Sequence, residues 1–317
     1  MDALHMCGIC LGVIVLFATV YALFYSKKAM LMNPFLDKHL LERGTDKPIL
    51  WLYYNDSDVN QRNWLDFGAR NTHALNIPFL NLCYERIVAL NHKEYQVRVI
   101  AGLSGLAEIL GANALPVDLQ NPIAPVNSAE MNWIRTAVLA RYGGLWVSPY
   151  VVQLKGFGVL PKKVVFFGTD MSETYSGSAG TAVPGFNAVW SPVKNHPLFV
   201  KWASVCFDRI QEKRGGQQIR KDENWDFVRF TSEYGGIMMD PHSELSRKPD
   251  GKRLQLEDLL ASGIDGKVPF TVYPHSVYVP FSYVELRDRR MFGWFLRMSA
   301  EQIMESDLAV SALLRMK

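Results

Sequence analysis

Residues 127–156 constrain this chain most, because they place a helix, a glycine turn and an extended run in direct succession. The first four of them, 127–130, have the form of a capping box, and apolar residues then recur at helical spacing. This pattern predicts a helix over about 128–141. Gly143 and Gly144 should end it, because glycine adopts backbone angles that residues with side chains resist.

The same segment resembles the central motif of glycosyltransferases with a sugar-binding DXD region, especially the capsular-polysaccharide-synthesis type. That motif reads approximately S-D-x-x-R-x-x-x-L-x-x-Y-G-G-x-W-x-D-x-x. The chain follows it, with Asn in place of the first Asp, at Asn132, Arg135, Leu139, Tyr142, Gly143, Gly144 and Trp146. The resemblance implies an α/β, GT-A-like (Rossmann-like) domain with a mostly parallel central sheet. It also implies a UDP- or GDP-sugar donor.

The chain departs from the motif where the family binds metal. Ser148 replaces the Asp that binds a divalent cation and the sugar nucleotide, and Tyr150 stands where a second acidic or polar residue would be. Mn²⁺ and Mg²⁺ prefer carboxylate and phosphate oxygens, and a serine hydroxyl is a much poorer ligand. Three alternatives stay open: another group binds the cation, the reaction needs none, or the chain no longer transfers sugar.

Arg135 is the residue that we expect to bind the donor and to stabilise its phosphates during catalysis. A guanidinium pairs bidentately with phosphate and keeps its charge, although a surface salt bridge is the alternative. By resemblance, the other donor-binding residues are Tyr142, Gly143, Gly144, Trp146, Ser148 and Tyr150.

An apolar run ending in aromatics, residues 48–54, predicts a first buried strand. Ligands of open α/β sheets sit beyond the carboxyl ends of strands, so Tyr53 and Tyr54 are candidates to stack on the nucleotide base. The alternative is that both are core aromatics.

Asp56 and Asp58 form a DxD pattern after this strand and are candidate metal ligands. Asp is also common in turns, because it accepts local backbone hydrogen bonds. His275, in a predicted loop, is a third candidate ligand, although a lone His is more often a structural hydrogen-bonding group.

Asp170 follows a predicted strand over 163–168 and is a candidate catalytic carboxylate; the alternative is that it caps the next turn. The glycine- and serine-rich segment 173–185 predicts a lid over the donor. Asn187 and Trp190, in a strand that resembles one of the family, are candidate acceptor-binding residues.

Strands and helices alternate along the chain, which predicts a parallel α/β sheet. Helices are expected over 77–92, 104–110, 197–213 and 299–316, and a second strand over 95–100. The chain has 34 Lys and Arg against 31 Asp and Glu, an excess too small to predict nucleic-acid binding.

Residues 7–25 are uncharged and mainly apolar, and as a helix they would span about 28 Å, close to the thickness of a bilayer core. They predict a membrane anchor after a short tail (1–6), followed by a stem (26–47) and the main domain (48–317); a cleaved signal peptide is the alternative. By resemblance the domain is lumenal, as in the Golgi or ER. Lys27 and Lys28 favour a cytosolic domain instead.

These observations together predict a membrane-anchored glycosyltransferase-like protein. It would transfer a hexose from a nucleotide-sugar to a glycan, lipid or protein hydroxyl. The alternative is a catalytically inactive relative that binds a glycan or a protein as a membrane-tethered assembly component, because a fold alone does not decide function.

Overall fold

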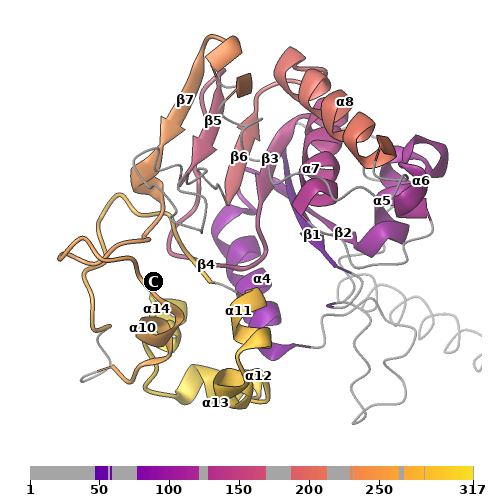
Figure 1. Ribbon diagram of the computed structural model, residues 1–317. Helices are drawn as coiled ribbons and strands as arrows, with labels where there is room; N and C mark the ends of the chain where they lie inside the picture. Colours follow the sequence, from indigo (N-terminus) through magenta and orange to yellow (C-terminus); the bar gives the residue numbers. More distant parts are fainter. Residues whose placement is uncertain are drawn as a thin grey trace, which may run out of the picture. The chain divides into compact units, whose positions relative to one another are not determined.

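The computed structural model describes residues 47–55, 58, 77–120, 128–168, 187–212, 229–230, 232–263, 268–281 and 283–316 (Figure 1). All of these belong to a compact unit that spans residues 46–317. The predicted tail, anchor and stem, and also Asp56, Asp170 and the predicted lid, lie outside these ranges. Within them, no helix is both long and apolar enough to cross a membrane.

A six-stranded sheet forms the centre of this unit, in the order β2-β1-β3-β6-β5-β7. Neighbouring strands run parallel except where β6 pairs with β3 and β5. The predicted α/β fold with a mostly parallel sheet is therefore confirmed. The strands are β1 (Ile49–Tyr54), β2 (Gln96–Ala101), β3 (Gly144–Val147), β5 (Val164–Phe167), β6 (Ala188–Ser191) and β7 (Ile237–Asp240).

Helices cover both faces of this sheet. Side chains alternate along β1, so that Trp51 contacts Tyr142 at the end of α7, whereas Tyr54 lies beside Cys83 and Tyr84 of α4. The long helices agree with the sequence prediction within a few residues; Figure 1 shows α7 and α8 side by side. They are α4 (Pro78–Asn91), α5 (Gly102–Leu110), α7 (Ser128–Tyr142) and α8 (Pro197–Glu212), with the short η2 (Ala112–Ala114) and α6 (Val117–Gln120) between α5 and α7.

A lobe of short elements follows the sheet and lies below it in Figure 1. It is built on a second, antiparallel pair of strands, β4 (Val151–Gln153) and β8 (Tyr278–Pro280). The other elements are η4 (Pro241–Ser243), α10 (Leu256–Leu260), α11 (Tyr283–Asp288), η5 (Arg290–Phe292), α12 (Gly293–Leu296), α13 (Ala300–Glu305) and α14 (Ala309–Arg315).

The prediction of one closing helix over 299–316 is wrong, because the chain leaves the helical conformation at Ser306 (φ −71°, ψ 158°). The residues after it pair with another segment instead: Leu308 bridges Ser262, and the amide of Ala309 donates to Ala261 O at 2.9 Å. Tertiary pairing overrides the helical periodicity at this point.

Arg86 of α4 connects the end of β4 with α14 near the end of the chain. Its guanidinium donates to Gln153 O, to Leu314 O at 2.9 Å and to Leu154 O at 3.4 Å. Burial lowers the pKa of Arg86, so these carbonyl contacts offset part of the cost of a half-buried charge.

We expect Arg86→Ala to lower the free energy of unfolding by about 3 kcal/mol, because three carbonyls lose a charged donor at once. Urea unfolding of the variant and the parent protein measures this. The matched control is Arg229→Ala, which removes an exposed ion pair with Glu233 and should cost less than about 0.5 kcal/mol. Equal effects of the two variants would refute the stabilising role of Arg86.

Candidate functional site

One edge of the sheet brings several polar side chains together. The carboxyl ends of β1, β3, β5 and β7 meet there with the amino end of the antiparallel β6. Open α/β sheets bind their ligands at this edge. The polar residues that flank the strand ends are Asn55, Asp58, Ser148, Tyr150, Asn187 and Asp240.

The Asp58 cluster lies at the end of β1 and consists of Asn55, Asp58, Tyr150 and Tyr283. Tyr150 donates its hydroxyl to Asp58 Oδ2, and Asn55 Nδ2 donates to Tyr150 Oη at 3.4 Å. The rings of Tyr150 and Tyr283 stack with centroids 5.0 Å apart and an angle of 9° between them. Tyr283 also hydrogen-bonds Asp58, so two tyrosines hold one carboxyl group.

Asp58 is fully buried, at 0% exposure. Burial raises its pKa above the usual 3.8, and the tyrosine hydrogen bonds oppose this only in part. Because the folded chain keeps the proton to a higher pH than the unfolded chain, stability falls as the pH rises from about 4 through the folded pKa.

Asp58→Asn is expected to gain stability relative to the parent protein as the pH rises from about 4 to about 8. Asn keeps an oxygen that accepts from Tyr150, and it removes the buried charge. Thermal unfolding midpoints across this pH range measure the difference.

The matched control is Asp250→Asn. Asp250 is exposed, and a hydrogen bond from the backbone of Lys252 lowers its pKa. That carboxylate stabilises the fold above its usual pKa, so its loss should give the opposite pH trend. If the parent protein instead became more stable relative to Asp58→Asn as the pH rises, the raised pKa of Asp58 would be contradicted.

The second group of polar residues is the Glu244 cluster, which consists of Asn187, Glu244 and Tyr278. Asn187 Nδ2 donates to Glu244 Oε2 at 2.9 Å, and Tyr278 Oη donates to Phe167 O at 3.0 Å beside the same carboxylate. Burial, followed by the charge of Glu244, raises the pKa of the Tyr278 hydroxyl. Gly168 makes room for this arrangement, since a Cβ there would collide with Glu244 Oε2.

Ser148 lies between the two clusters. It is half-buried directly after β3, its amide donates to Asn187 O at 2.7 Å, and its hydroxyl accepts from the amide of Tyr150 at 3.4 Å. Ser148, Tyr150, Asn187 and Asp58 are therefore predicted site residues that the structure brings together.

Two buried polar atoms at this edge have no hydrogen-bond partner among the residues that the structure describes. They are the hydroxyl of Tyr54, a residue at 0% exposure, and the Oδ1 atom of Asn55. Buried polar groups are normally paired with protein or with an ordered water or ligand. The unpaired atoms therefore mark the end of β1 as a place that a polar ligand or water would complete.

The side chains that the structure describes at this edge do not form a donor set that fits a metal ion. No three His, Cys, Asp or Glu side chains in the described ranges lie close enough together to bind one. Ser148 offers a hydroxyl, and the carboxyl of Asp58 already accepts from two tyrosines. His275 is exposed and its ring contacts His242, 5.5 Å between centroids, and Tyr273, also 5.5 Å.

Other predicted donor residues lie at the opposite edge of the sheet, where β3 begins. Tyr142 donates its hydroxyl to Ile109 O at 2.7 Å, and Gly143 O accepts from Trp51 Nε1 at 2.9 Å. Gly143 and Gly144 have φ angles of 68° and 96°, which confirms the predicted glycine stop. In this structure these residues shape the turn from α7 into β3.

The predicted aromatic residues of the strands are buried. Tyr53 stacks on Trp146 with centroids 6.4 Å apart, and Tyr54 lies on the opposite face of β1. Trp190 donates to Pro161 O at 2.8 Å, away from Asn187 at the other end of β6. These positions are those that the core-aromatic alternative predicts for Tyr53 and Tyr54.

Arg135 lies in the middle of α7. Its guanidinium donates to Asn132 Oδ1, and burial lowers its pKa to about 10, while Cys206 of α8 acts against this shift. The described contacts of Arg135 are thus with its own helix and with the adjoining α8, and not with the two clusters.

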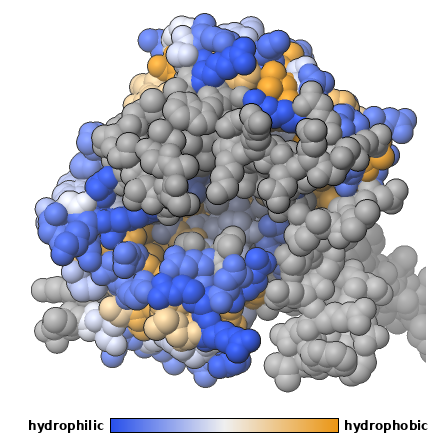
Figure 2. Space-filling model, in the orientation of Figure 1, coloured by the Kyte–Doolittle hydropathy of each residue, from blue (hydrophilic) through white to orange (hydrophobic). Residues whose placement is uncertain are grey.

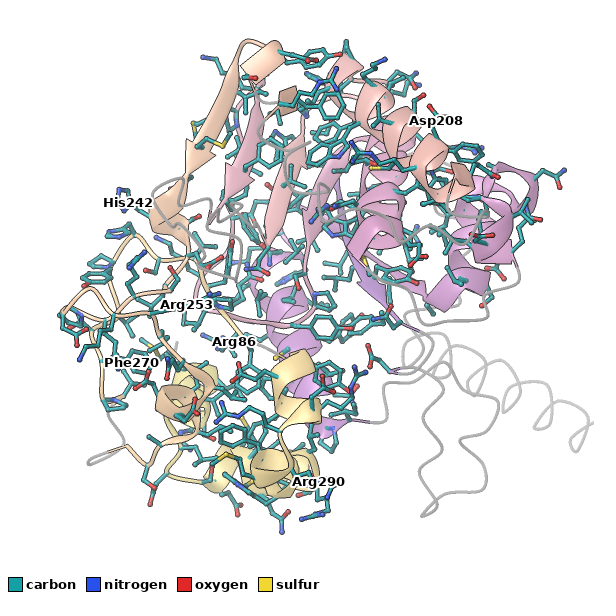
Figure 3. All side chains as sticks on the ribbon, in the orientation of Figure 1. Arg86, Asp208, His242, Arg253, Phe270 and Arg290 are labelled. Carbon is teal, nitrogen blue, oxygen red and sulfur yellow. The ribbon has the colours of Figure 1, made fainter. Side chains whose placement is uncertain are left out.

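Sequence reasoning missed Tyr283, Glu244 and Tyr278. They come from the last third of the chain, where no motif or periodicity distinguishes them. Figure 3, which shows the side chains on the ribbon, includes His242 on η4, just before Glu244, at the end of β7. Only the tertiary fold places this segment at the strand ends.

No family model and no curated protein matches the chain. Among solved structures, the chain is similar to the PaToxG glycosyltransferase. The TM-score is 0.37 and the sequence identity 13%, over 59% of this chain and 69% of that chain. A likeness this distant assigns neither a family nor an activity.

Proposed function

We propose that this chain binds a nucleoside-diphosphate sugar at the carboxyl edge of its sheet and transfers the hexose to a hydroxyl group of a glycan, lipid or protein. One observation carries the proposal. Ser148 and Tyr150, which the sequence motif assigns to the donor, lie at this edge beside the unpaired polar atoms of Tyr54 and Asn55.

Glu244 is the carboxylate that we assign to the reaction. It is half-buried and is oriented by Asn187, and its carboxylate can accept a proton at the sheet edge. The acceptor hydroxyl gives its proton to Glu244 while its oxygen bonds to the sugar's anomeric carbon. The bond from that carbon to the diphosphate breaks, and the nucleoside diphosphate leaves with the bonding electrons.

In this proposal, hydrogen-bond donors stabilise the negative charge of the diphosphate, without a metal ion at the Ser148 position. Hydrogen-bond donors fixed in a partly buried site stabilise developing negative charge, because they need little reorganisation during the reaction. The hydroxyl of Ser148, whose oxygen accepts from the amide of Tyr150, is the donor in place.

A catalytically inactive, membrane-tethered binding protein is the second candidate function. It is favoured by one observation: Tyr150, at the motif's second acidic position, is already hydrogen-bonded to the buried Asp58. The membrane anchor over 7–25 belongs to either proposal and awaits a test, and neither proposal fixes the side of the membrane on which the domain lies.

Release of nucleoside diphosphate tests the two functions. The purified full chain is incubated with UDP- and GDP-hexoses, once with EDTA and once with Mn²⁺. We expect release that EDTA does not abolish. Release in Mn²⁺ alone would contradict the metal-free site, and no release from any donor would favour the binding protein.

A further inference from the structure

A short surface segment presents apolar and cationic side chains together. We call it the Arg290–Arg297 surface; it consists of Arg290, Met291, Trp294 and Arg297, on η5, on α12 and directly after α12. Met291 is 63% and Trp294 41% exposed, whereas Phe292 and Phe295 between them are buried and fix the segment to the lobe. The exposed apolar side chains are thus held outward by a rigid support.

Neighbouring arginines are neutralised within the protein. Arg289 binds Glu285 and Glu257 and lies over the ring of Phe292, 4.6 Å from its centroid. Arg287 pairs with Asp288 at 3.4 Å. The carboxylates of Glu257, Glu285 and Asp288 are thus already paired with these two arginines.

Arg290 and Arg297 are different. Both are exposed, and neither makes an ion pair through its side chain with any residue in the described ranges. Figure 3 shows Arg290 at the outer end of the lobe, and in Figure 2 this end carries apolar and strongly hydrophilic atoms side by side. Two cationic groups therefore flank an exposed tryptophan and methionine.

We propose that the Arg290–Arg297 surface docks the domain on an anionic lipid membrane. Trp and Met enter the boundary between headgroups and acyl chains, and arginine side chains pair with lipid phosphates and carboxylates above it. The positive charge without internal partners is what selects an anionic surface over a neutral one. This proposal is independent of the proposed transferase activity.

The docking also bears on the orientation that the sequence leaves open. Anionic lipids concentrate in the cytoplasmic leaflet, so a surface of this kind serves a domain on the cytosolic side. Lys27 and Lys28, after the predicted anchor, favour the same side.

Hydrogen exchange of the full chain in lipid nanodiscs tests the proposal. The amides of residues 290–298 should exchange several-fold more slowly with phosphatidylserine present than in phosphatidylcholine alone, and high salt should remove the difference. The variant Arg290→Glu with Arg297→Glu should lose the protection, since each arginine contributes about fivefold to the docking equilibrium. Lys201→Glu on α8, also an exposed cation, is the matched control and should keep it.

Equal exchange in both lipids would overturn the proposal. So would protection that persists in the double variant, or protection in neutral lipid that grows with protein concentration, which would identify self-association. If the double variant does not fold, the salt dependence of the parent protein decides, because a docking without electrostatic attraction would not respond to salt.

Discussion

Glu244→Gln is expected to reduce sugar transfer at least about a hundredfold while the protein stays folded. The amide is nearly the same size as the carboxylate and keeps an oxygen for Asn187, but it cannot accept the acceptor's proton. Release of nucleoside diphosphate under saturating donor measures the effect on kcat. Donor affinity should change little, because the diphosphate is bound on the Ser148 side.

Glu233→Gln is the matched control for this variant, since Glu233 is an exposed carboxylate paired only with the surface residue Arg229 in the described part of the chain. It should leave turnover unchanged. Transfer by Glu244→Gln at the parent rate would remove Glu244 from the reaction, and Asp58 and Asp240 would then be the carboxyl groups that remain at the described strand ends.

Gly144→Ala is expected to destabilise the fold by about 4 kcal/mol or more, a large part of a typical domain's stability. Gly144 has φ 96°, which L-residues with a Cβ avoid, and that Cβ would collide with the backbone oxygen of Ile49. The collision is with the neighbouring strand β1, which has no room to shift inside the sheet. Thermal and urea unfolding, or loss of soluble protein, measure the effect.

The same change at Gly235 is the matched control. A Cβ there meets no atom within 4 Å, so Gly235→Ala should shift stability by less than about 0.5 kcal/mol. If both variants unfold alike, Gly144 does not act through its close approach to β1, and its place in the turn after α7 is explained by local propensity alone.

The sequence predicts the elements of this fold well where the pattern is local. Helical spacing in α4, α7 and α8, and the apolar run of β1, reflect burial of one face or of a whole strand, which neighbouring residues alone reveal. The break at Ser306 is not local, because it depends on a bridge between Leu308 and Ser262, and periodicity does not report such a pairing.

The site is predicted only in part. The motif directs attention to Ser148 and Tyr150, and the structure places both after β3 at the carboxyl edge. Tyr150 hydrogen-bonds Asp58, which is 92 residues away in sequence, and Asn187 hydrogen-bonds Glu244, which is 57 residues away. Such contacts are set by strand order and not by spacing, so the sequence singled out Asp58 without its pairing to Tyr150, and it did not single out Glu244.

The motif also includes residues whose positions are explained by folding. Tyr142 and Gly144 lie at the amino end of β3, where a hydroxyl contact to α5 and a close approach to β1 account for them. A motif that spans a helix, a turn and a strand contains both scaffold and site, and only the structure separates the two.

Calorimetric titration of the full chain with UDP, GDP and their hexose conjugates, with and without Mn²⁺, tests donor binding at the carboxyl edge of the sheet. We expect one nucleotide series to bind at micromolar concentration with little dependence on Mn²⁺, and replacement of Ser148 by a bulky residue should weaken that binding. A folded protein that binds none of these nucleotides, or binds only with Mn²⁺, would contradict it.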